Sequence, residues 1–307
     1  MASDLQLINL ESRNLKMNLS NDNPLAVGEH EVFIEGVRQV YHVAGNGPVC
    51  LVHSGGPGFH WKYLQMPELE KTMTMVYLEP VGTGKSDMLP DGNYSMPRYA
   101  LFAHKVAEHI GVQKYYFLGH AHGGGVGIQY ALDYPNELSG LILQSSAPTM
   151  NMDLYMEQFT QIEIFAQRWP DNAEAEDAKQ AMMDSKNVRD KESALAVLHR
   201  LLPAYFGNYW DVKDKVDKWK VDLDFFGDPN RQPYEWDVRD ILHTITTPTL
   251  ILVGEYDVNC GPRWSNEMAE KIPGSQLVIF DRGGHMEHVE HAEPFTQAVN
   301  EFVAHTK

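Results

Sequence analysis

The segment Gly119-His120-Ala121-His122-Gly123 has the spacing of a nucleophile elbow, a turn whose central side chain attacks an acyl carbon. An apolar and aromatic run precedes it and a glycine-rich run follows it, which predicts a strand, a sharp turn and a helix. Flanking glycines suit this turn, because its central residue has a strained backbone and the helix starts close to the strand. The central residue here is alanine, which tolerates that backbone but has no oxygen. The segment therefore predicts the geometry of a nucleophile without its reactive atom.

Nucleophilic acyl transfer also requires a base beside the nucleophile and a carboxylate that orients the base. Asp257 and His285 each follow a short apolar run, so both are expected just after the end of a strand. Ligand chemistry in open α/β sheets concentrates at the carboxyl ends of the strands, where the turn at Ala121 is also expected. The order of nucleophile, acid and histidine along the chain is one of the known orders of a catalytic triad. We therefore predict a triad of position 121, Asp257 and His285, with Asp281 and Glu255 as alternative acids.

The same chemistry needs backbone N–H donors for the negatively charged oxygen of the reaction intermediate. One donor belongs to the residue after the nucleophile, and the other to the loop after the third strand. The run Ser54-Gly55-Gly56-Pro57-Gly58 follows that strand, and its lack of bulky side chains lets amides approach a reacting carbonyl. We predict Gly56 and His122 as the donors of this oxyanion hole.

The apolar pattern predicts the elements that would position these residues. Two short strands separated at a glycine come first, and six solidly apolar runs follow. The predicted strands are 31–36, 37–44, 49–52, 75–78, 115–118, 141–143, 250–253 and 277–280. Solidly apolar runs separated by helical segments are typical of a parallel sheet that is buried on both faces. Between about residues 148 and 233 only amphipathic helices are predicted.

We therefore predict an α/β fold with an eight-stranded, mostly parallel sheet flanked by helices, and a helical cap inserted after the sixth strand. The core would comprise residues 30–147 and 234–307, and the cap residues 148–233. Residues 1–29 would form an N-terminal arm. A chain of 307 residues is long enough for one such domain with a large insertion.

Composition limits the partners and the compartment. Lys and Arg total 25 against 42 Asp and Glu, and the formal net charge of −17 opposes binding to nucleic acid or anionic membrane surfaces. Only Cys50 and Cys260 occur, which does not indicate a disulfide framework and fits a reducing compartment. The N-terminus lacks the pattern of a secretory signal, and no apolar run approaches a membrane span. We expect a cytoplasmic protein with a small-molecule substrate and no cofactor; the sequence leaves its oligomeric state open.

Two other patterns suggest different chemistry and are rejected. Gly82-Thr83-Gly84-Lys85-Ser86 resembles the end of a phosphate-binding loop, but Glu79 stands where that motif has its first glycine, and a carboxylate would repel phosphate. His285, His288 and His291 could suggest zinc, yet their spacing across a loop-to-helix junction suits a catalytic histidine followed by a solvated helix. We predict neither a nucleotide site nor a metal site.

Several segments together resemble the α/β hydrolases of the proline iminopeptidase-like group, and the resemblance spans most of residues 30–305. They are Ser54-Gly55-Gly56-Pro57-Gly58, Gly82-Thr83-Gly84-Lys85-Ser86, the turn at Gly119, and Gly254-Glu255-Tyr256-Asp257 with Gly284-His285. The resemblance implies a hydrolase with a Ser, Asp and His triad at positions 121, 257 and 285. It also implies a helical cap that shapes the substrate pocket.

The chain departs from this group at positions besides Ala121. Ser54 replaces the histidine that precedes GGPG, and His53 is displaced by one place. The resemblance implies that the aminopeptidases hold the free amine of their substrate with acidic residues, and Arg231 and Val258 stand at those positions. Neither a cation nor an apolar group attracts an ammonium ion, so the chain disfavours release of an N-terminal proline.

The predicted cap is rich in aromatic residues and methionine, most of which are expected to form its own core. Those that face the catalytic edge would line a pocket for a bulky, largely apolar group. We expect substrate contacts from Gly55, Phe59, His60, Tyr155, Phe159 and Trp210.

The leading interpretation is a serine hydrolase of an ester, lactone or amide, working through an acyl-enzyme and present here as an inactive nucleophile-to-Ala variant. One alternative is a prolyl aminopeptidase. Another is a ligand receptor without catalysis, in which Ala121 is the native residue. Haloalkane dehalogenases and epoxide hydrolases are excluded, because both need a carboxylate at position 121.

Overall fold

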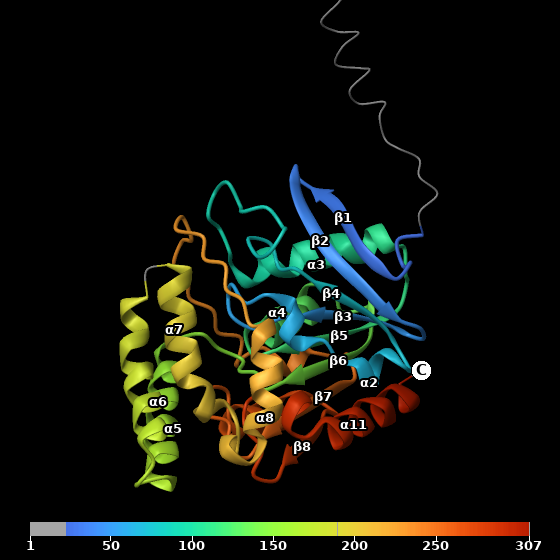
Figure 1. Ribbon diagram of the computed structural model, residues 1–307. Helices are drawn as coiled ribbons and strands as arrows, with labels where there is room; N and C mark the ends of the chain where they lie inside the picture. The colour runs from blue at the N-terminus through green and yellow to red at the C-terminus, as the bar shows by residue number, and fades with distance from the viewer. Residues whose placement is uncertain (1–22, 189, 307) are drawn as a thin grey trace, which may run out of the picture.

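One central sheet organises the protein, as the computed structural model of residues 23–188 and 190–306 shows (Figure 1). Its strands lie in the order β1-β2-β4-β3-β5-β6-β7-β8. They are β1 (Gly28–Ile34), β2 (Val37–Gly45), β3 (Val49–His53), β4 (Thr74–Leu78), β5 (Tyr115–His120), β6 (Leu138–Gln144), β7 (Thr249–Gly254) and β8 (Gln276–Phe280). The β1-β2 and β2-β4 pairs are antiparallel, and every other pair is parallel. The predicted eight-stranded, mostly parallel sheet is confirmed.

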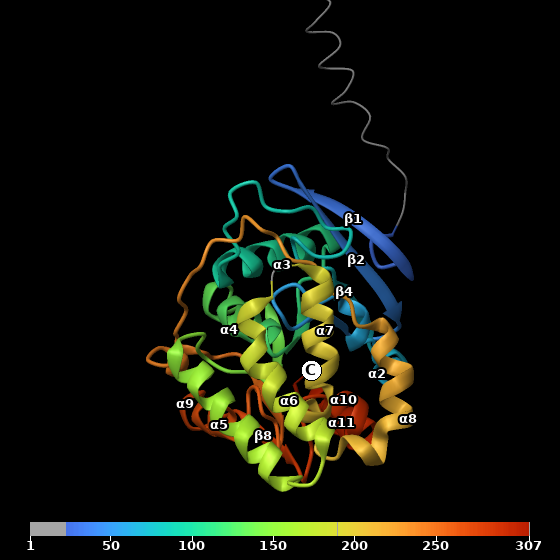
Figure 2. The same cartoon turned by 60° about the vertical axis from the view of Figure 1, so that its left-hand side comes forward.

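Helices cover both faces of this sheet, which is why its inner strands are solidly apolar. Every residue of β4 and of β5 is buried. One face is covered by α3 (Met96–Ile110), α4 (His122–Asp133) and α9 (Pro262–Lys271), and the other by α2 (Pro67–Glu70) and α11 (Ala292–His305) (Figures 1 and 2). Successive residues of β3 point to opposite layers, with Leu51 in the first and Cys50 and Val52 in the second.

The predicted helical insertion lies between β6 and β7. It contains α5 (Met152–Arg168), α6 (Ala173–Asp184), α7 (Lys191–Leu201) and α8 (Tyr209–Trp219). In Figure 2, α5, α6 and α7 lie in front of the sheet, and α8 lies at the right-hand side. Polar side chains begin the first three of these helices: Asn151, Asn172 and Asp190 each accept a backbone N–H of the first turn. The insertion therefore follows the sixth strand, as predicted.

The turn itself agrees with the sequence pattern, in which an apolar and aromatic run, an elbow and a glycine-rich run predict a strand, a sharp turn and a helix. β5 extends to His120, two residues beyond the predicted strand 115–118, and α4 begins at His122. Ala121 alone makes the turn, because its backbone conformation reverses the chain in one residue. Residues 1–22 of the predicted arm lie outside the described residues, and β1 begins at Gly28. None of the helices that the structure describes is long and apolar enough to cross a membrane.

Candidate active site

Ala121 stands between β5 and α4 in a conformation that few side-chain-bearing residues adopt. Its φ is 50° and its ψ is −115°. Gly123, in the first turn of α4, lies so close to the end of β3 that an added Cβ would overlap the carbonyl oxygens of His53 and Ser54. Packing of the turn against β3 thus maintains the backbone of an elbow at Ala121.

Asp257 and His285 form a buried, hydrogen-bonded pair. Nδ1 of His285 lies 2.9 and 3.0 Å from the two carboxylate oxygens of Asp257. The backbone N–H groups of Asn259 and Cys260 also donate to Asp257 Oδ1. Burial alone lowers the pKa of His285, but the charge and hydrogen bond of Asp257 outweigh it and raise that pKa. Burial also raises the pKa of Asp257, yet contact with His285 leaves it below its ordinary value.

This pairing leaves Nε2 as the nitrogen of His285 that can serve a reacting group, because Nδ1 faces the carboxylate. His285 lines the cavity that adjoins Ala121. The alternative acids lie elsewhere. The side chain of Asp281 is 83% exposed, and Glu255 accepts the N–H of Arg282 at 2.9 Å.

The two predicted oxyanion donors are free in the part of the chain that the structure describes. There, the backbone N–H groups of Gly56 and His122 donate to no protein acceptor. His122 is the first residue of α4, where helix N–H groups are unpaired and the helix dipole is positive. Ser54, which replaces the expected histidine, donates from Oγ to the carbonyl oxygen of Phe59 at 2.9 Å and so braces the loop. Both N–H groups are therefore unpaired in the described structure, as donors that serve a ligand would be.

A chain of hydrogen bonds joins the oxyanion loop, the elbow and the histidine loop. The N–H of Gly55 donates to the hydroxyl of Tyr63 at 2.7 Å, and that hydroxyl lies 2.7 Å from His120 Nδ1. His120 Nε2 lies 3.0 Å from the carbonyl oxygen of His285. Burial, and then the nearby His285, lowers the pKa of His120 well below its ordinary value, so His120 is neutral and has one N–H. Nε2 must carry this hydrogen, because a carbonyl can only accept.

A second buried carboxylate, Glu287, lies at the start of α10 (Glu287–Glu290). Its Oε1 accepts from Ser145 Oγ at 2.5 Å and from the N–H of Gly254 at 2.8 Å, and its Oε2 accepts from Gln144 Nε2 at 2.9 Å. These partners end β6 and β7, so Glu287 ties two strand ends to the histidine loop. Burial, and then the charge of Asp257, raises the pKa of Glu287 to about 7.

Sequence reasoning missed Tyr63, His120 and Glu287 as parts of the site. The only signal for His120 was its place beside the elbow. The expectation of a solvated helix after the histidine is wrong, because Glu287 and His288 are buried. His288 binds Gln144 Nε2 through Nδ1 and the carbonyl oxygen of Tyr63 through Nε2, so α10 packs beneath the site.

The cavity at Ala121 has two lobes. The larger lobe measures about 240 Å³ and reaches into the helical insertion, and the smaller lobe measures about 150 Å³ and lies over α4 and the loop after β6. Gly56, Ala121, Gln158 and Asn259 line both lobes. Position 121 is therefore at their junction, and a bond held there would place one substituent in each lobe.

The described linings of the lobes contain no carboxylate, ammonium or guanidinium group, since no Asp, Glu, Lys or Arg is among their residues. At the junction, the Gln158 amide donates to the carbonyl oxygen of Asn259 at 3.3 Å. A ligand here meets apolar walls, two amide side chains and the groups of the elbow, which suits an uncharged molecule.

The structure distributes the six predicted substrate contacts over different places. Gly55 and Phe59 line the larger lobe, and Tyr155 lines the smaller lobe. The other three line neither lobe. His60 faces the buried Glu79, with Nε2 3.9 Å from Oε1, and Phe159 lies 38% exposed on α5. Trp210 packs on Trp169 and donates from Nε1 to Glu174 at 2.7 Å.

The two positions expected to anchor an amine are also filled by packing. Val258 is buried in the core of the helical insertion. Arg231 stacks on Tyr94 and donates to the hydroxyl of Tyr99 at 2.9 Å. The acid Glu157, on α5, pairs with Arg263 at 3.0 Å and faces away from the lobes.

One group of described residues brings carboxylate and imidazole atoms close enough to hold a metal ion: Glu29, His42 and Glu79. Its members already pair with other groups. Lys85 Nζ lies 2.5 Å from Glu29, and His42 Nε2 lies 2.6 Å from Glu79. The backbone N–H of Lys85 also donates to Glu79. The loop of residues 82–86, whose sequence resembles the end of a phosphate-binding loop, is thus held by Glu79 through the backbone N–H of Lys85, and the side chain of Lys85 pairs with Glu29.

Comparison with known proteins agrees with this geometry. Residues 47–292 match the sequence model of a family described as the alpha/beta hydrolase fold. A 2-hydroxymuconate semialdehyde hydrolase of Pseudomonas sp. (strain CF600) is 24% identical over 297 residues, covering 94% of this chain and 97% of that protein. A proline iminopeptidase of Saccharolobus solfataricus is 26% identical over 289 residues, covering 86% and 87%.

Solved structures share the fold. The esterase RhEst1 from Rhodococcus sp. ECU1013 matches with a TM-score of 0.72 at 18% sequence identity, covering 92% of this chain and 100% of the esterase. A thermophilic esterase from Thermogutta terrifontis matches with a TM-score of 0.69 at 22% identity, covering 91% and 99%. At these identities the likeness concerns the architecture.

Proposed function

The chain belongs to the α/β-hydrolase fold family, and from that premise we propose that its site is that of a serine hydrolase whose nucleophile position holds Ala121. In this form the chain binds a neutral, largely apolar ester, lactone or amide and forms no acyl-enzyme. One observation carries the substrate class: the described residues that line the two lobes include no Asp, Glu, Lys or Arg. Burying an unpaired charge there is strongly unfavourable, whereas burying apolar surface is favourable.

The arrangement supports one order of steps when a serine stands at position 121. Nε2 of His285 takes the hydroxyl proton as the oxygen attacks the carbonyl carbon, and Asp257 holds the required tautomer. The N–H groups of Gly56 and His122 stabilise the oxyanion. His285 then gives the proton to the leaving group as its bond to the carbonyl carbon breaks. A water molecule, activated by His285, hydrolyses the acyl-enzyme and regenerates the serine.

The helical insertion, residues 148–233, acts as the cap that shapes the substrate pocket. Gln158 on α5, Leu198 on α7 and Tyr205 all line the larger lobe. With alanine at the elbow, the base, the donors and this cap still form a binding site. Loss of a triad nucleophile typically lowers turnover by about 10⁶-fold, which leaves binding as the main remaining activity.

Two alternatives have an observation in their favour. The similarity to a proline iminopeptidase favours a prolyl aminopeptidase, but the described lining of the lobes offers no acid for the free amine. Ala121 itself favours a receptor that has never been catalytic, in which the elbow is only a scaffold. Restoring the serine separates these alternatives from the proposal.

Ala121→Ser should create hydrolysis of neutral esters and sensitivity to fluorophosphonates, because the paired His285 supplies a base and the unpaired N–H groups of Gly56 and His122 supply oxyanion donors. The parent chain, incubated with the same activated esters, should show no acyl-enzyme by mass spectrometry and no burst. His285→Ala in the serine background is the matched control, and it should abolish both hydrolysis and labelling.

The opposite results would reject the proposal. A stoichiometric acyl-enzyme on the parent chain would show that another residue is the nucleophile. A folded Ala121→Ser variant that neither cleaves a broad panel of esters, lactones and amides nor reacts with fluorophosphonates would favour the receptor.

A further inference from the structure

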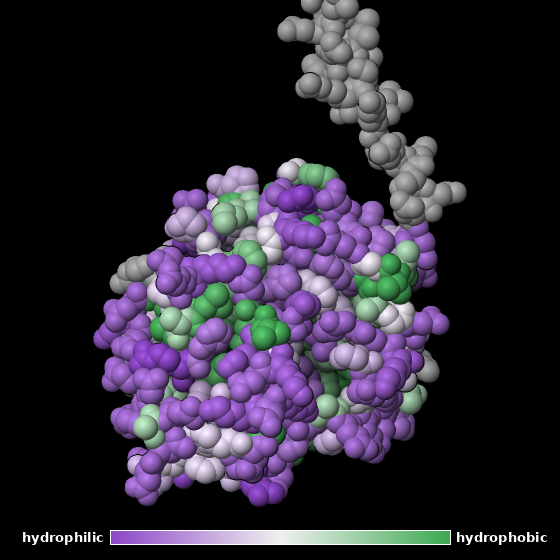
Figure 3. All heavy atoms as spheres, viewed as in Figure 1, coloured by the Kyte–Doolittle hydropathy of each residue, from purple (hydrophilic) through white to green (hydrophobic). Residues whose placement is uncertain are grey.

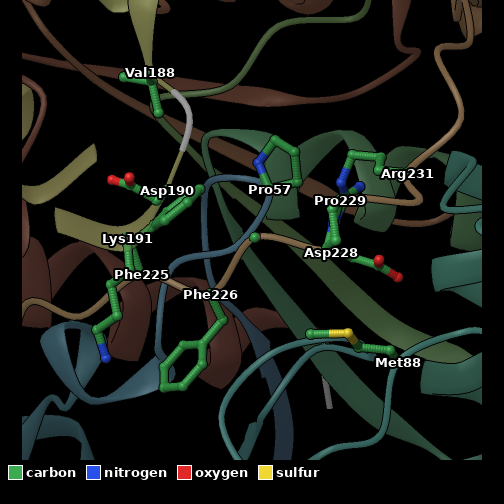
Figure 4. Close-up of a pocket in the computed structure, with 11 residues that line it drawn as sticks. Pro57, Met88, Val188, Asp190, Lys191, Phe225, Phe226, Asp228, Pro229 and Arg231 are labelled. Carbon is green, nitrogen blue, oxygen red and sulfur yellow. The ribbon is translucent and has the colours of Figure 1, made fainter. Parts of the chain in front are cut away.

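A third cavity, larger than either lobe, lies at the border between the cap and the core. It measures about 570 Å³ and is called the outer cavity below. Pro57 and Met88 line it from the core, and the start of α7 and the segment 225–231 line it from the cap (Figure 4). Apolar side chains also gather near the middle of the largely hydrophilic face in Figure 3. None of the charged groups discussed above for catalysis belongs to this cavity.

The outer cavity adjoins the catalytic site through the oxyanion loop. Pro57 lines both the outer cavity and the smaller lobe. The same loop pairs with the cap segment that forms the other wall: the N–H of Phe226 donates to Gly58 O at 2.8 Å, and the N–H of His60 donates to Asp224 O at 3.0 Å. A molecule in the outer cavity would therefore contact the loop that carries the Gly56 donor.

The walls of the outer cavity are mainly apolar, from Pro57, Met88, Val188, Phe225, Phe226 and Pro229. Both cations among its described lining residues already contact other groups of the protein. Lys191 Nζ pairs with Asp224 at 2.6 Å and lies over the Phe226 ring, and Arg231 stacks on Tyr94 at 4.1 Å.

Its acids are engaged as well. Asp228 accepts the Tyr94 hydroxyl at 2.5 Å, and Asp190 caps α7 by accepting the N–H of Ser193 at 2.9 Å. Among the described residues, the lining contains two cations and two acids, and each makes contacts of its own with the protein, although Nη1 of Arg231 is buried without a hydrogen-bond partner. A neutral apolar ligand gains burial against the aromatic and proline side chains without disturbing those pairs.

We propose that the outer cavity is a distal substrate subsite, which binds the neutral apolar arm of an elongated substrate whose reacting bond lies over Ala121. This proposal rests on the proposed function for the identity of the molecule as a substrate. The subsite itself rests on the shared wall at Pro57, the mainly apolar lining and the contacts that already engage the charged groups of the described lining.

Binding of ethyl acetate, ethyl butyrate and ethyl octanoate to the parent chain, measured by titration calorimetry, tests the subsite directly. Because each buried methylene strengthens binding by about fourfold, octanoate should bind at least about tenfold more tightly than butyrate. Met88→Trp should narrow the outer cavity with a larger side chain and reduce the ratio of octanoate to acetate affinity by about tenfold or more. Met183→Trp is the matched control, since Met183 on α6 is 48% exposed against 50% for Met88 and lines none of the three cavities.

Phe226→Ala provides a second variant, because it removes an aromatic wall without filling space. It should also lower the ratio of octanoate to acetate affinity. The subsite is refuted if octanoate binds no more tightly than butyrate, if no ester binds, or if the folded Met88→Trp and Phe226→Ala variants keep the parent ratio.

Hydrolysis by Ala121→Ser tests the proposed function separately. If that variant is inactive while the dependence of binding on chain length disappears in Met88→Trp, the proposed function fails and the apolar subsite stands. If Ala121→Ser hydrolyses acetate and octanoate esters with equal kcat/KM, and Met88→Trp does not change that ratio, the proposed function stands and the subsite fails.

Discussion

Replacing Glu287 by glutamine should make the stability of the protein less sensitive to rising pH. Glu287 is fully buried, and its pKa is raised from 4.5 to about 7, first by burial and then by the charge of Asp257. Above about pH 4.5 the unfolded chain releases this proton while the folded chain still holds it, so stability falls as the pH approaches 7. Glutamine has nearly the same shape and no charge, and therefore removes this loss.

The size of the effect follows from the two pKa values. The difference between 4.5 and about 7 corresponds to about 3 kcal/mol of unfolding free energy, of which about 2.5 kcal/mol is lost between about pH 5 and pH 8. Glutamine can still accept from Ser145 and Gly254. Rotation of the Gln144 amide would turn its oxygen, which is buried and unpaired in the described structure, toward the new NH₂ group, but it would break the hydrogen bond from Gln144 Nε2 to His288 Nδ1. These changes in hydrogen bonding act equally at both pH values.

Urea unfolding of the parent chain and of Glu287→Gln at about pH 5 and pH 8 measures this difference. The parent should lose about 2.5 kcal/mol more than the variant between the two conditions. Glu270→Gln, on the exposed side of α9, should behave like the parent. The pKa of His285, followed by NMR, should fall in Glu287→Gln, because the Glu287 carboxylate helps to raise it. Equal stability changes at both pH values, with an unmoved His285 pKa, would refute the reasoning.

Three further outcomes are expected. Gly123→Ala should lower the unfolding free energy by about 2 kcal/mol or more, because the added Cβ would overlap the backbone of His53. Gly227→Ala is the control, since its Cβ would meet only the Phe225 ring, and equal urea midpoints for the two variants would contradict the packing at Gly123. In the serine background, Asp257→Asn should lower kcat by about 10⁴-fold by changing the histidine tautomer, and a loss below tenfold in steady-state assays would count against the triad. In that background a prolyl arylamide should be cleaved less efficiently than its N-acylated form, and a large preference for the free amine would restore the aminopeptidase.

The sequence was sufficient where local pattern and chain order determine the structure. The solidly apolar runs predicted the parallel sheet, since only burial on both faces suits such strands. The same pattern placed Asp257 and His285 after strand ends, and parallel strands bring those ends to one edge of the sheet. The place of Gly56, in the loop just after the third strand, was predicted from the end of that strand in the same way.

Tertiary packing determines what the sequence did not reveal. Tyr63 reaches His120 across 57 positions of chain, and His120 reaches the carbonyl of His285 across 165, so no local spacing signals the contact. On α5, Tyr155 and Gln158 line the lobes, whereas Phe159 lines neither, although it lies one turn after Tyr155 on a similar side of the helix. Helical spacing selects the side of the helix, and the packing of the cap on the core decides which residue of that side reaches the cavity.

The hydrogen-bonded chain from Gly55 through Tyr63 and His120 to His285 makes no use of the side chain at position 121. The surroundings of the elbow therefore keep their alignment whichever small residue occupies it. Under the proposed function, one substitution at position 121 separates a binding protein from a catalyst. Alanine can replace serine there, or serine alanine, without any change in the rest of the site. Selection on such a chain can act on ligand affinity and on turnover at different times, because the framework that supports both is the same.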